Sequence, residues 1–178
     1  LPVTNGYRSV GFQLRGAGLP GGRTLYNCWR SQDSLLRTVY VGAATDGTLW
    51  LFGEEVPEWA ALNTPAAWNG EDLTFATVSG LGFIFVPGAG LYEINGGTGL
   101  LVQQTVAGID EATALGICGS FGYLIFYDTT SIYYSSATDP LDHVPSITTG
   151  AGSGAVQEAR GAIRYLVQTS LGFNIYCE

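Results

Sequence analysis

Two stretches of the chain, Leu73–Ile94 (LTFATVSGLGFIFVPGAGLYEI) and Thr113–Tyr134 (TALGICGSFGYLIFYDTTSIYY), align with each other without a gap. In this alignment Gly82 meets Gly122, and apolar, aromatic-rich runs follow both glycines. Each stretch has the pattern of a strand, a short turn ending in glycine, and a second strand rich in aromatic residues. This pattern predicts an antiparallel hairpin in each stretch.

Two further copies of the pattern are present. IRYLVQTSLGFNIYC, at 163–177, places its Leu-Gly-Phe on the Leu-Gly-Phe of 81–83, and TVYVGAATDGTLWLF, at 38–52, has Gly47 in the same slot. A repeat at a fixed period is the signature of a repeat architecture. We therefore expect units near 38–52, 73–94, 113–134 and 163–178.

Residues typical of turns occur within these units and between them. Asp46-Gly47 supplies the positive φ of a two-residue hairpin turn, and the same role is predicted for Gly82, Gly122 and Gly172. Asn95-Gly96 marks another turn. The stretches 53–72 and 135–155 are rich in Pro, Gly and Ser and are predicted to be loops.

The predicted fold class is all-β, in one domain or fragment spanning residues 1–178. Units of roughly 35–50 residues with a few strands each are typical of β-propeller blades, and a propeller needs at least about four of them. Because the last copy stops after its second strand, we expect a partial propeller of a longer chain, or a last blade completed by another segment. A β-sandwich is the alternative.

Charge is scarce and unevenly placed. Charged residues make up 12% of the chain, and all seven basic residues are arginines. Five arginines and one acid, Asp33, fall within the first 37 residues, giving +4; two arginines and 14 acids follow, giving −12, which sums to −8. This balance argues against wrapping nucleic acid, which needs many cationic phosphate contacts. The arginine-rich start either docks on an acidic neighbour or is solvated.

Cysteine usage and hydropathy exclude other classes. Cys28, Cys118 and Cys177 are an odd and widely spaced set, which predicts reduced, buried thiols rather than a disulfide framework or a metal site. No apolar run reaches 18 residues, so no membrane span is predicted.

No group of residues predicts catalysis, a cofactor or a metal. His143 is the only histidine and lies beside Asp139 and Asp142, which we interpret as formers of Asx-type turns on a surface loop. A glycosidase needs two carboxylates that face each other, and adjacency in sequence does not provide this. The adjacent carboxylate pairs are Glu54-Glu55, Glu71-Asp72 and Asp110-Glu111.

Two other features were weighed as binding sites. The glycine-rich stretches 16–24 and 149–155 lack the phosphate-loop pattern GxxxxGK[ST] and are interpreted as flexible turns. Aromatic residues either pack in the core or stack on sugars and anchor a partner, with core packing favoured. They are Trp50, Trp59, Trp68 and the pair Tyr133-Tyr134.

Residues 131–176 resemble a segment that recurs in tailed-bacteriophage virion proteins with propeller domains, of the tail nozzle, tail-tubular or tail hub type. The family pattern runs from a strand ending in an aromatic-Ser-Ser step, through a DP turn and a TGAG stretch, to an RG-I step and a final strand. The matching residues are Tyr134-Ser135-Ser136, Asp139-Pro140-Leu141-Asp142, Thr149-Gly150-Ala151-Gly152, Arg160-Gly161-Ala162-Ile163 and Gly172-Phe173-Asn174-Ile175-Tyr176. Two departures are His143, where an aromatic residue is usual, and a chain shorter than a full nozzle protein.

The resemblance implies a structural component of a phage tail or neck, located in the virion and in the host cytoplasm during assembly. It implies a homo-oligomeric ring, contacts with portal, adaptor or tail proteins, passage of DNA without specific binding, and no catalytic residues. An acidic wall formed by residues 38–178 would let DNA slide, and acids on the outer rim would contradict that wall. The alternative function is a carbohydrate- or protein-binding propeller module.

Overall fold

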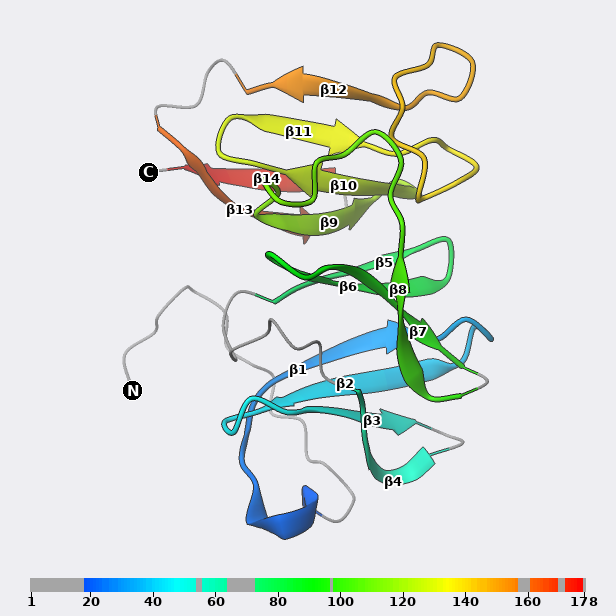
Figure 1. Ribbon diagram of the computed structural model, residues 1–178, viewed down its shortest axis with the longest axis vertical. Coiled ribbons are helices and arrows are strands. Elements are labelled where there is room, and N and C mark those ends of the chain that lie inside the picture. Colours follow the sequence, from blue (N-terminus) through cyan, green and yellow to red (C-terminus); the bar gives the residue numbers. More distant parts are fainter. Residues whose placement is uncertain are drawn as a thin grey trace.

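The computed structural model describes residues 18–53, 56–63, 73–96, 98–156, 161–169 and 172–177, and in these ranges the chain is almost entirely β (Figure 1). A short 3-10 helix, η1 (Pro20–Gly22), precedes the first strand. The strands of the first sheet are β1 (Leu25–Gln32), β2 (Thr38–Ala44), β3 (Leu49–Gly53) and β4 (Val56–Ala61). Those of the second are β5 (Thr74–Val78), β6 (Leu81–Val86), β7 (Gly90–Asn95) and β8 (Leu100–Gln104). The third sheet has β9 (Gly116–Ser120), β10 (Tyr123–Tyr127), β11 (Ser131–Tyr134) and β12 (Gly152–Ala155), and β13 (Ile163–Thr169) and β14 (Gly172–Cys177) form a hairpin.

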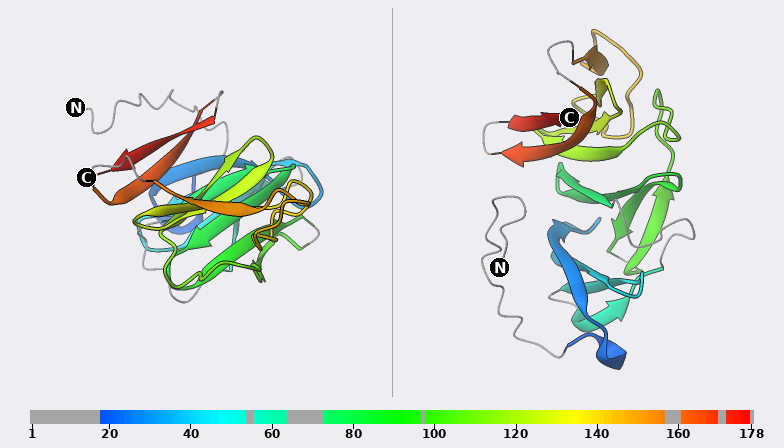
Figure 2. Two further views of the ribbon diagram at one scale, coloured as in Figure 1. Left: turned by 90° about the horizontal axis from the view of Figure 1, so that it is seen from above. Right: turned by 90° about the vertical axis from the view of Figure 1, so that its left-hand side faces the viewer.

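Each sheet is an antiparallel meander in which the strands pair in sequence order. The three four-stranded sheets follow one another along the long axis of the molecule, and the hairpin β13–β14 lies against the third sheet (Figures 1 and 2). The all-β prediction is confirmed. The described strands form neither a closed propeller nor the two sheets of a sandwich.

The predicted hairpins are present at all four repeat units, but in the second unit the predicted position of the turn is wrong. The two-residue turn between β5 and β6 is Ser79-Gly80, with φ of 52° and 81°, and its counterpart between β9 and β10 is Phe121-Gly122, with φ of 50° and 83°. Gly82 therefore lies inside β6, and the turn lies two residues earlier than predicted. Because side chains alternate with a period of two, a shift of two residues leaves the alternation between the two faces of the sheet unchanged.

The other turn predictions need smaller corrections. Gly47 has the predicted positive φ, 78°, but the loop has three residues: the Gly47 N–H bonds to the Ala44 carbonyl, and the Ala44 N–H bonds to the Thr48 carbonyl. Gly172 has a positive φ, 147°, and is the first residue of β14. The Asn95-Gly96 turn is present between β7 and β8. The sequence did not reveal β1 or β8, and the two predicted loops contain β4 and β12.

The apolar core lies between the sheets. A first cluster joins the first and second sheets and comprises Val39, Val41, Ala43, Leu49, Leu51, Leu62, Ile84, Val86, Ile94 and Leu101. A second joins the second and third sheets and comprises Ala76, Val78, Phe83, Phe85, Leu91, Val106, Ala114, Ile117, Leu124 and Phe126. β6 contributes to both because its alternate side chains point to opposite faces. Within the second cluster the rings of Phe85 and Phe126 meet edge to face with centroids 5.4 Å apart.

Candidate interaction surface

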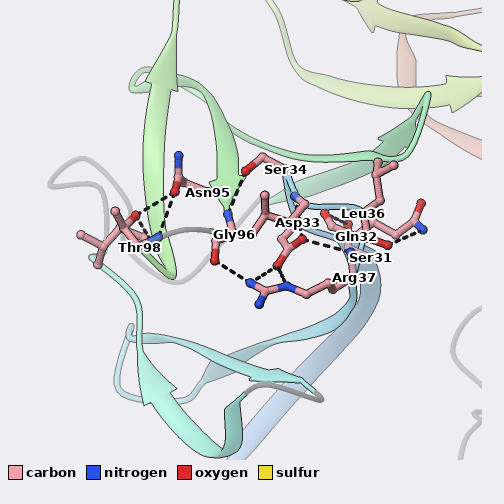
Figure 3. Close-up of polar contacts among 11 residues, drawn as sticks. Ser31, Gln32, Asp33, Ser34, Leu36, Arg37, Asn95, Gly96 and Thr98 are labelled. Atoms are coloured by element: carbon pink, nitrogen blue, oxygen red, sulfur yellow. Dashed lines mark hydrogen bonds and ion pairs between the residues drawn. The ribbon is translucent and has the colours of Figure 1, made fainter.

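A buried ion pair ties the first sheet to the second (Figure 3). Asp33, between β1 and β2, is 1% exposed, and its Oδ2 accepts hydrogen bonds from Nε and Nη2 of Arg37 at 2.9 and 2.8 Å. Arg37 Nη2 also donates to the carbonyl oxygen of Gly96, in the turn between β7 and β8. From the other side, the Gly96 N–H donates to Ser34 Oγ at 2.9 Å. We call Asp33, Ser34, Arg37 and Gly96 the inter-sheet clamp.

The electrostatics of the clamp follow from its partners. Burial by itself would raise the pKa of Asp33, but hydrogen bonds from Arg37 and from the Leu35 N–H, together with the Arg37 charge, lower this pKa below its usual value. A methyl group at Gly96 would meet the Asp33 carboxylate at 2.7 Å. The clamp thus joins the first two sheets through contacts within the chain.

Further polar contacts hold neighbouring sheets together. Asn63, just after β4, exchanges two hydrogen bonds with the backbone of Leu101 in β8, at 2.9 and 2.7 Å. Between the second and third sheets, the Ile117 N–H donates to Thr74 Oγ1 at 2.8 Å. These contacts serve the stacking of the sheets.

The sequence analysis placed His143 on a surface loop, but in the structure it is a core residue. It is 2% exposed, its Nε2 lies 3.0 Å from the Leu124 carbonyl oxygen, and its ring meets Phe126 edge to face. Burial lowers the pKa of His143, although the nearby Leu124 and Leu141 carbonyls and Asp142 and Asp139 oppose this change. The predicted Asx turns are confirmed: one carboxylate oxygen of Asp139 accepts from the Leu141 N–H, and one of Asp142 accepts from the Val144 N–H.

The remaining polar candidates are dispersed. Of the adjacent carboxylate pairs, only Asp110-Glu111 lies within the described residues, and Asp110 there caps a turn through the Ala112 N–H. Burial raises the pKa of Glu111, against hydrogen bonds from the Leu91 and Val106 backbone. In the described part of the chain, no three metal-binding side chains come together. The glycine-rich stretch 149–155 leads into and forms β12. Of the stretch 16–24, residues 18–24 are described and contain η1, in which Gly21 and Gly22 have positive φ.

Two arginines of the N-terminal group have partners in the chain. Arg23 pairs with Asp46 at 2.5 Å and lies over the Trp50 ring, and Arg37 belongs to the clamp. Arg30 is exposed on β1, and Arg8 and Arg15 lie outside the described residues.

Most of the weighed aromatic residues pack inside the fold. Trp50 and Trp59 are buried in a third apolar cluster on the outer face of the first sheet, and Tyr133 donates a 2.8 Å hydrogen bond to Asp128. Trp68 lies outside the described residues. Tyr134 alone of the described candidates reaches the surface to a large extent, at 36% exposed.

The three cysteines are free, and only one is buried. Burial raises the pKa of the Cys118 thiol to about 11. Cys28 and Cys177 are exposed, which corrects the prediction of three buried thiols. Among the described residues no helix has the length and apolar character of a membrane span.

The surface feature that the sequence did not reveal is an apolar groove on the third sheet. Its cavity of about 310 Å³ is lined by Ser120, Phe121, Tyr123, Ile125, Ile132, Tyr134, Gly150 and Phe173. Beside it lies a second depression lined by Tyr134, Pro145, Ser146, Ile147, Gly150 and Ala151, in which Ile147 is fully exposed. The sequence alignment places Phe121 on Leu81, and only the structure shows that Phe121 occupies the turn position that Ser79 occupies in the preceding repeat.

Comparison with protein-family models found no match, and no curated protein matches the chain.

Proposed function

We propose that this chain is a structural component of a bacteriophage virion, in the tail or neck, that acts by protein–protein assembly. The observation that carries the proposal is the sequential stack of four-stranded meanders, in which the polar groups join one sheet to the next. The resemblance of residues 131–176 to propeller-bearing phage tail proteins is the reason for proposing a phage tail or neck as the assembly.

The finer proposal for the fold is an arc of propeller blades. The first strands of the units are neighbours: β5 contacts β1 and β9, and β9 contacts β13. In a propeller, the first strand of each blade lines the centre and the fourth lies at the rim. On this proposal the three sheets are blades, and β13–β14 is the inner half of a further blade.

The proposal does not retain the acidic wall. Within the described residues, the only charged side chains on β1, β5, β9 and β13 are Arg30 and Arg164. The described acids lie on turns, connectors and later strands instead: Asp33, Asp46, Glu58, Glu93, Asp110, Glu111, Asp128, Asp139 and Asp142. The proposal therefore does not include an acidic wall formed by these residues, and passage of DNA along the centre is proposed on the resemblance alone.

A carbohydrate-binding function is less well supported, because Trp50 and Trp59 are buried. A protein-binding function is favoured by the groove at Phe121 and Tyr134, which is largely apolar. Protein-binding surfaces are enriched in aromatic side chains at their centre.

The test is the location of the protein in infectious particles. Particles of the phage whose genome encodes the chain are purified and their proteins quantified by mass spectrometry, with the major capsid protein as reference. We expect a fixed low copy number per particle and density for a ring of this chain at the tail vertex in electron micrographs. Its absence from purified, infectious particles would refute the proposal.

A further inference from the structure

The third sheet contains a long loop that the other two sheets lack. Residues 135–151 connect β11 to β12, and Figure 1 shows this loop in yellow and orange beside the green connector that leads from β8 to β9. In the first sheet the corresponding connection is the short turn from Gly53 to Val56, and in the second sheet it is the turn from Asn95 to Leu100. The meander therefore folds without such a loop, and loops longer than about 12–15 residues are often functional. We call residues 135–151 the third-sheet loop.

The backbone of the third-sheet loop is fixed to the connector around His143. The His143 N–H donates to the Ala107 carbonyl at 2.9 Å, and the Ala107 N–H donates to the Leu141 carbonyl at 2.9 Å. Gly108 packs on the same segment, because a methyl group there would lie 2.7 Å from the carbonyl carbon of His143. The loop and the connector therefore touch at one short segment, with His143 at its centre.

The side chain of His143 fixes the same segment to β10. Its Nε2 lies 3.0 Å from the Leu124 carbonyl oxygen, and its ring meets Phe126 edge to face with centroids 5.2 Å apart. Since a carbonyl oxygen only accepts hydrogen bonds, Nε2 carries the hydrogen and Nδ1 is the basic nitrogen of the neutral ring. The closed loop is thus built around a neutral imidazole.

The nitrogen that would take up a proton is itself enclosed. Nδ1 of His143 and Oγ1 of Thr149, both in the third-sheet loop, are buried and have no hydrogen-bond partner among the described residues. Buried polar atoms without partners are few in native proteins, and each lowers the stability of the segment that contains it. A proton from solvent reaches Nδ1 only when the loop moves away, so protonation and opening are coupled.

The charged ring is disfavoured in the closed loop. Burial lowers the pKa of His143, although the Leu141 carbonyl and the carboxylates of Asp139 and Asp142 favour the charged form. In the open loop water solvates the charge, and this opposition disappears. Acid therefore shifts the equilibrium toward the open loop.

We propose that His143 is a pH-sensitive latch, whose neutral ring holds the third-sheet loop closed on β10 and the connector and whose protonation releases it. Histidine suits this role because its charge changes between pH 5 and 8. Release uncovers the Phe126 ring, which His143 contacts in the closed form. The sheet itself stays intact, since β11 pairs with β12 through residues 131–134, outside the loop. The latch does not depend on the proposed assembly function.

Other titratable groups near the latch define its controls. Asp139 and Asp142 lie on the third-sheet loop, Asp110 and Glu111 lie on the connector, and β10 carries no charged residue. Burial raises the pKa of Glu111, so this carboxylate also gains protons as the pH falls. A variant without the imidazole retains all four carboxylates and thereby isolates the contribution of His143.

The test is native-state amide exchange of the 178-residue chain at pH 7.5 and 5.5, with each rate divided by that of an unstructured peptide at the same pH. The amides that report on the loop are Ser136, Ala137, His143 and Ser146, whose N–H groups are hydrogen-bonded in the closed form. With a pKa of about 6.5 in the open loop, opening becomes up to about tenfold more favourable over this interval. We expect the protection of these amides to fall accordingly and to be insensitive to low urea concentrations, because local opening exposes little surface.

Variants assign the effect to the imidazole. His143→Phe keeps an aromatic ring beside Phe126 but does not titrate, and the Leu124 carbonyl remains bonded to the Ser135 N–H. Most of the change in protection should disappear in this variant. If it does not fold, His143→Gln serves the same purpose, because its amide can still donate to the Leu124 carbonyl.

A second measurement needs no variant. His143 is the only histidine of the chain, so its ring signals in NMR spectra are assigned without ambiguity. We expect the ring to titrate with a midpoint below about 6.5. A midpoint at or above this value would contradict the latch.

Three outcomes of the exchange experiment would overturn the latch. The first is equal protection of the loop amides at the two pH values. The second is an equal fall in the unchanged chain and in the variant without the imidazole, which would assign the effect to the carboxylates. The third is exchange of the loop amides at the same rate and with the same urea dependence as those of β6, which would mean that the loop opens only when the whole chain unfolds.

Discussion

Replacement of Arg37 by methionine tests whether the inter-sheet clamp stabilises the stack. The change removes both hydrogen bonds from the guanidinium to Asp33 and the one to the Gly96 carbonyl, while the Leu35 and Arg37 N–H groups still bond to Asp33. Removing one partner of a buried ion pair costs about 3–5 kcal/mol. Since the Arg37 side chain is 33% exposed and two backbone donors remain, we expect a cost below this range, about 2–3 kcal/mol.

The assay is equilibrium unfolding in urea at pH 7, followed by tryptophan fluorescence. The matched control is Arg23→Met, which breaks an ion pair that is more than one third exposed on both sides and should cost less than about 1 kcal/mol. Arg37→Lys keeps the charge without the two-pronged geometry and should fall between the two. If Arg37→Met costs no more than Arg23→Met, the clamp is not a stabilising contact.

The clamp also has a pH signature. Because the folded pKa of Asp33 is lowered, its contribution is present above the unfolded pKa, near 3.9, and is lost as the pH falls through the folded value. In Arg37→Met the side-chain donors and the positive charge are gone, so acid unfolding should begin at a higher pH. An unchanged acid transition would contradict this reasoning.

Three further predictions concern single residues. In Gly82→Ala the new methyl group would collide with Ser31 Oγ and the Gln32 carbonyl, so the free energy of unfolding should fall by about 2–4 kcal/mol. Gly154→Ala, where the methyl group meets nothing within 4 Å, should leave it nearly unchanged in the same urea titration. The lowered pKa of His143 means that the unfolded chain binds the proton more readily, so stability should fall as the pH drops below about 6.5. His143→Phe should flatten this dependence between pH 7.5 and 5, and an equal slope in both proteins would assign it to other groups. Cys118, buried and with a pKa of about 11, should resist a thiol reagent at pH 8 in the native protein, while exposed Cys177 reacts and all three thiols react in urea. Rapid labelling of Cys118 in the native state would show that the third sheet opens readily.

Local pattern was sufficient for the hairpins and insufficient for the site. The turns at Gly47 and Gly122 were predictable because positive φ is a property of a few neighbouring residues. Gly82 was misassigned because the ungapped alignment of 73–94 with 113–134 placed it on Gly122, whereas the neighbouring pair Ser79-Gly80 makes the turn. What forbids a side chain at Gly82 is Ser31 and Gln32 of another sheet, which no local pattern encodes.

The sequence by itself determined that the protein is a repeated all-β chain, because hairpin periodicity and turn glycines are local properties. The tertiary structure decided which residues of similar type are buried. It placed His143, Trp50 and Trp59 in the core and left Phe121 and Tyr134 at the surface. The physical reason is that burial depends on which distant segments pack against a side chain. His143 meets Leu124 and Phe126 of β10, and Trp50 and Trp59 pack with Leu19 from before β1, contacts that no local pattern encodes.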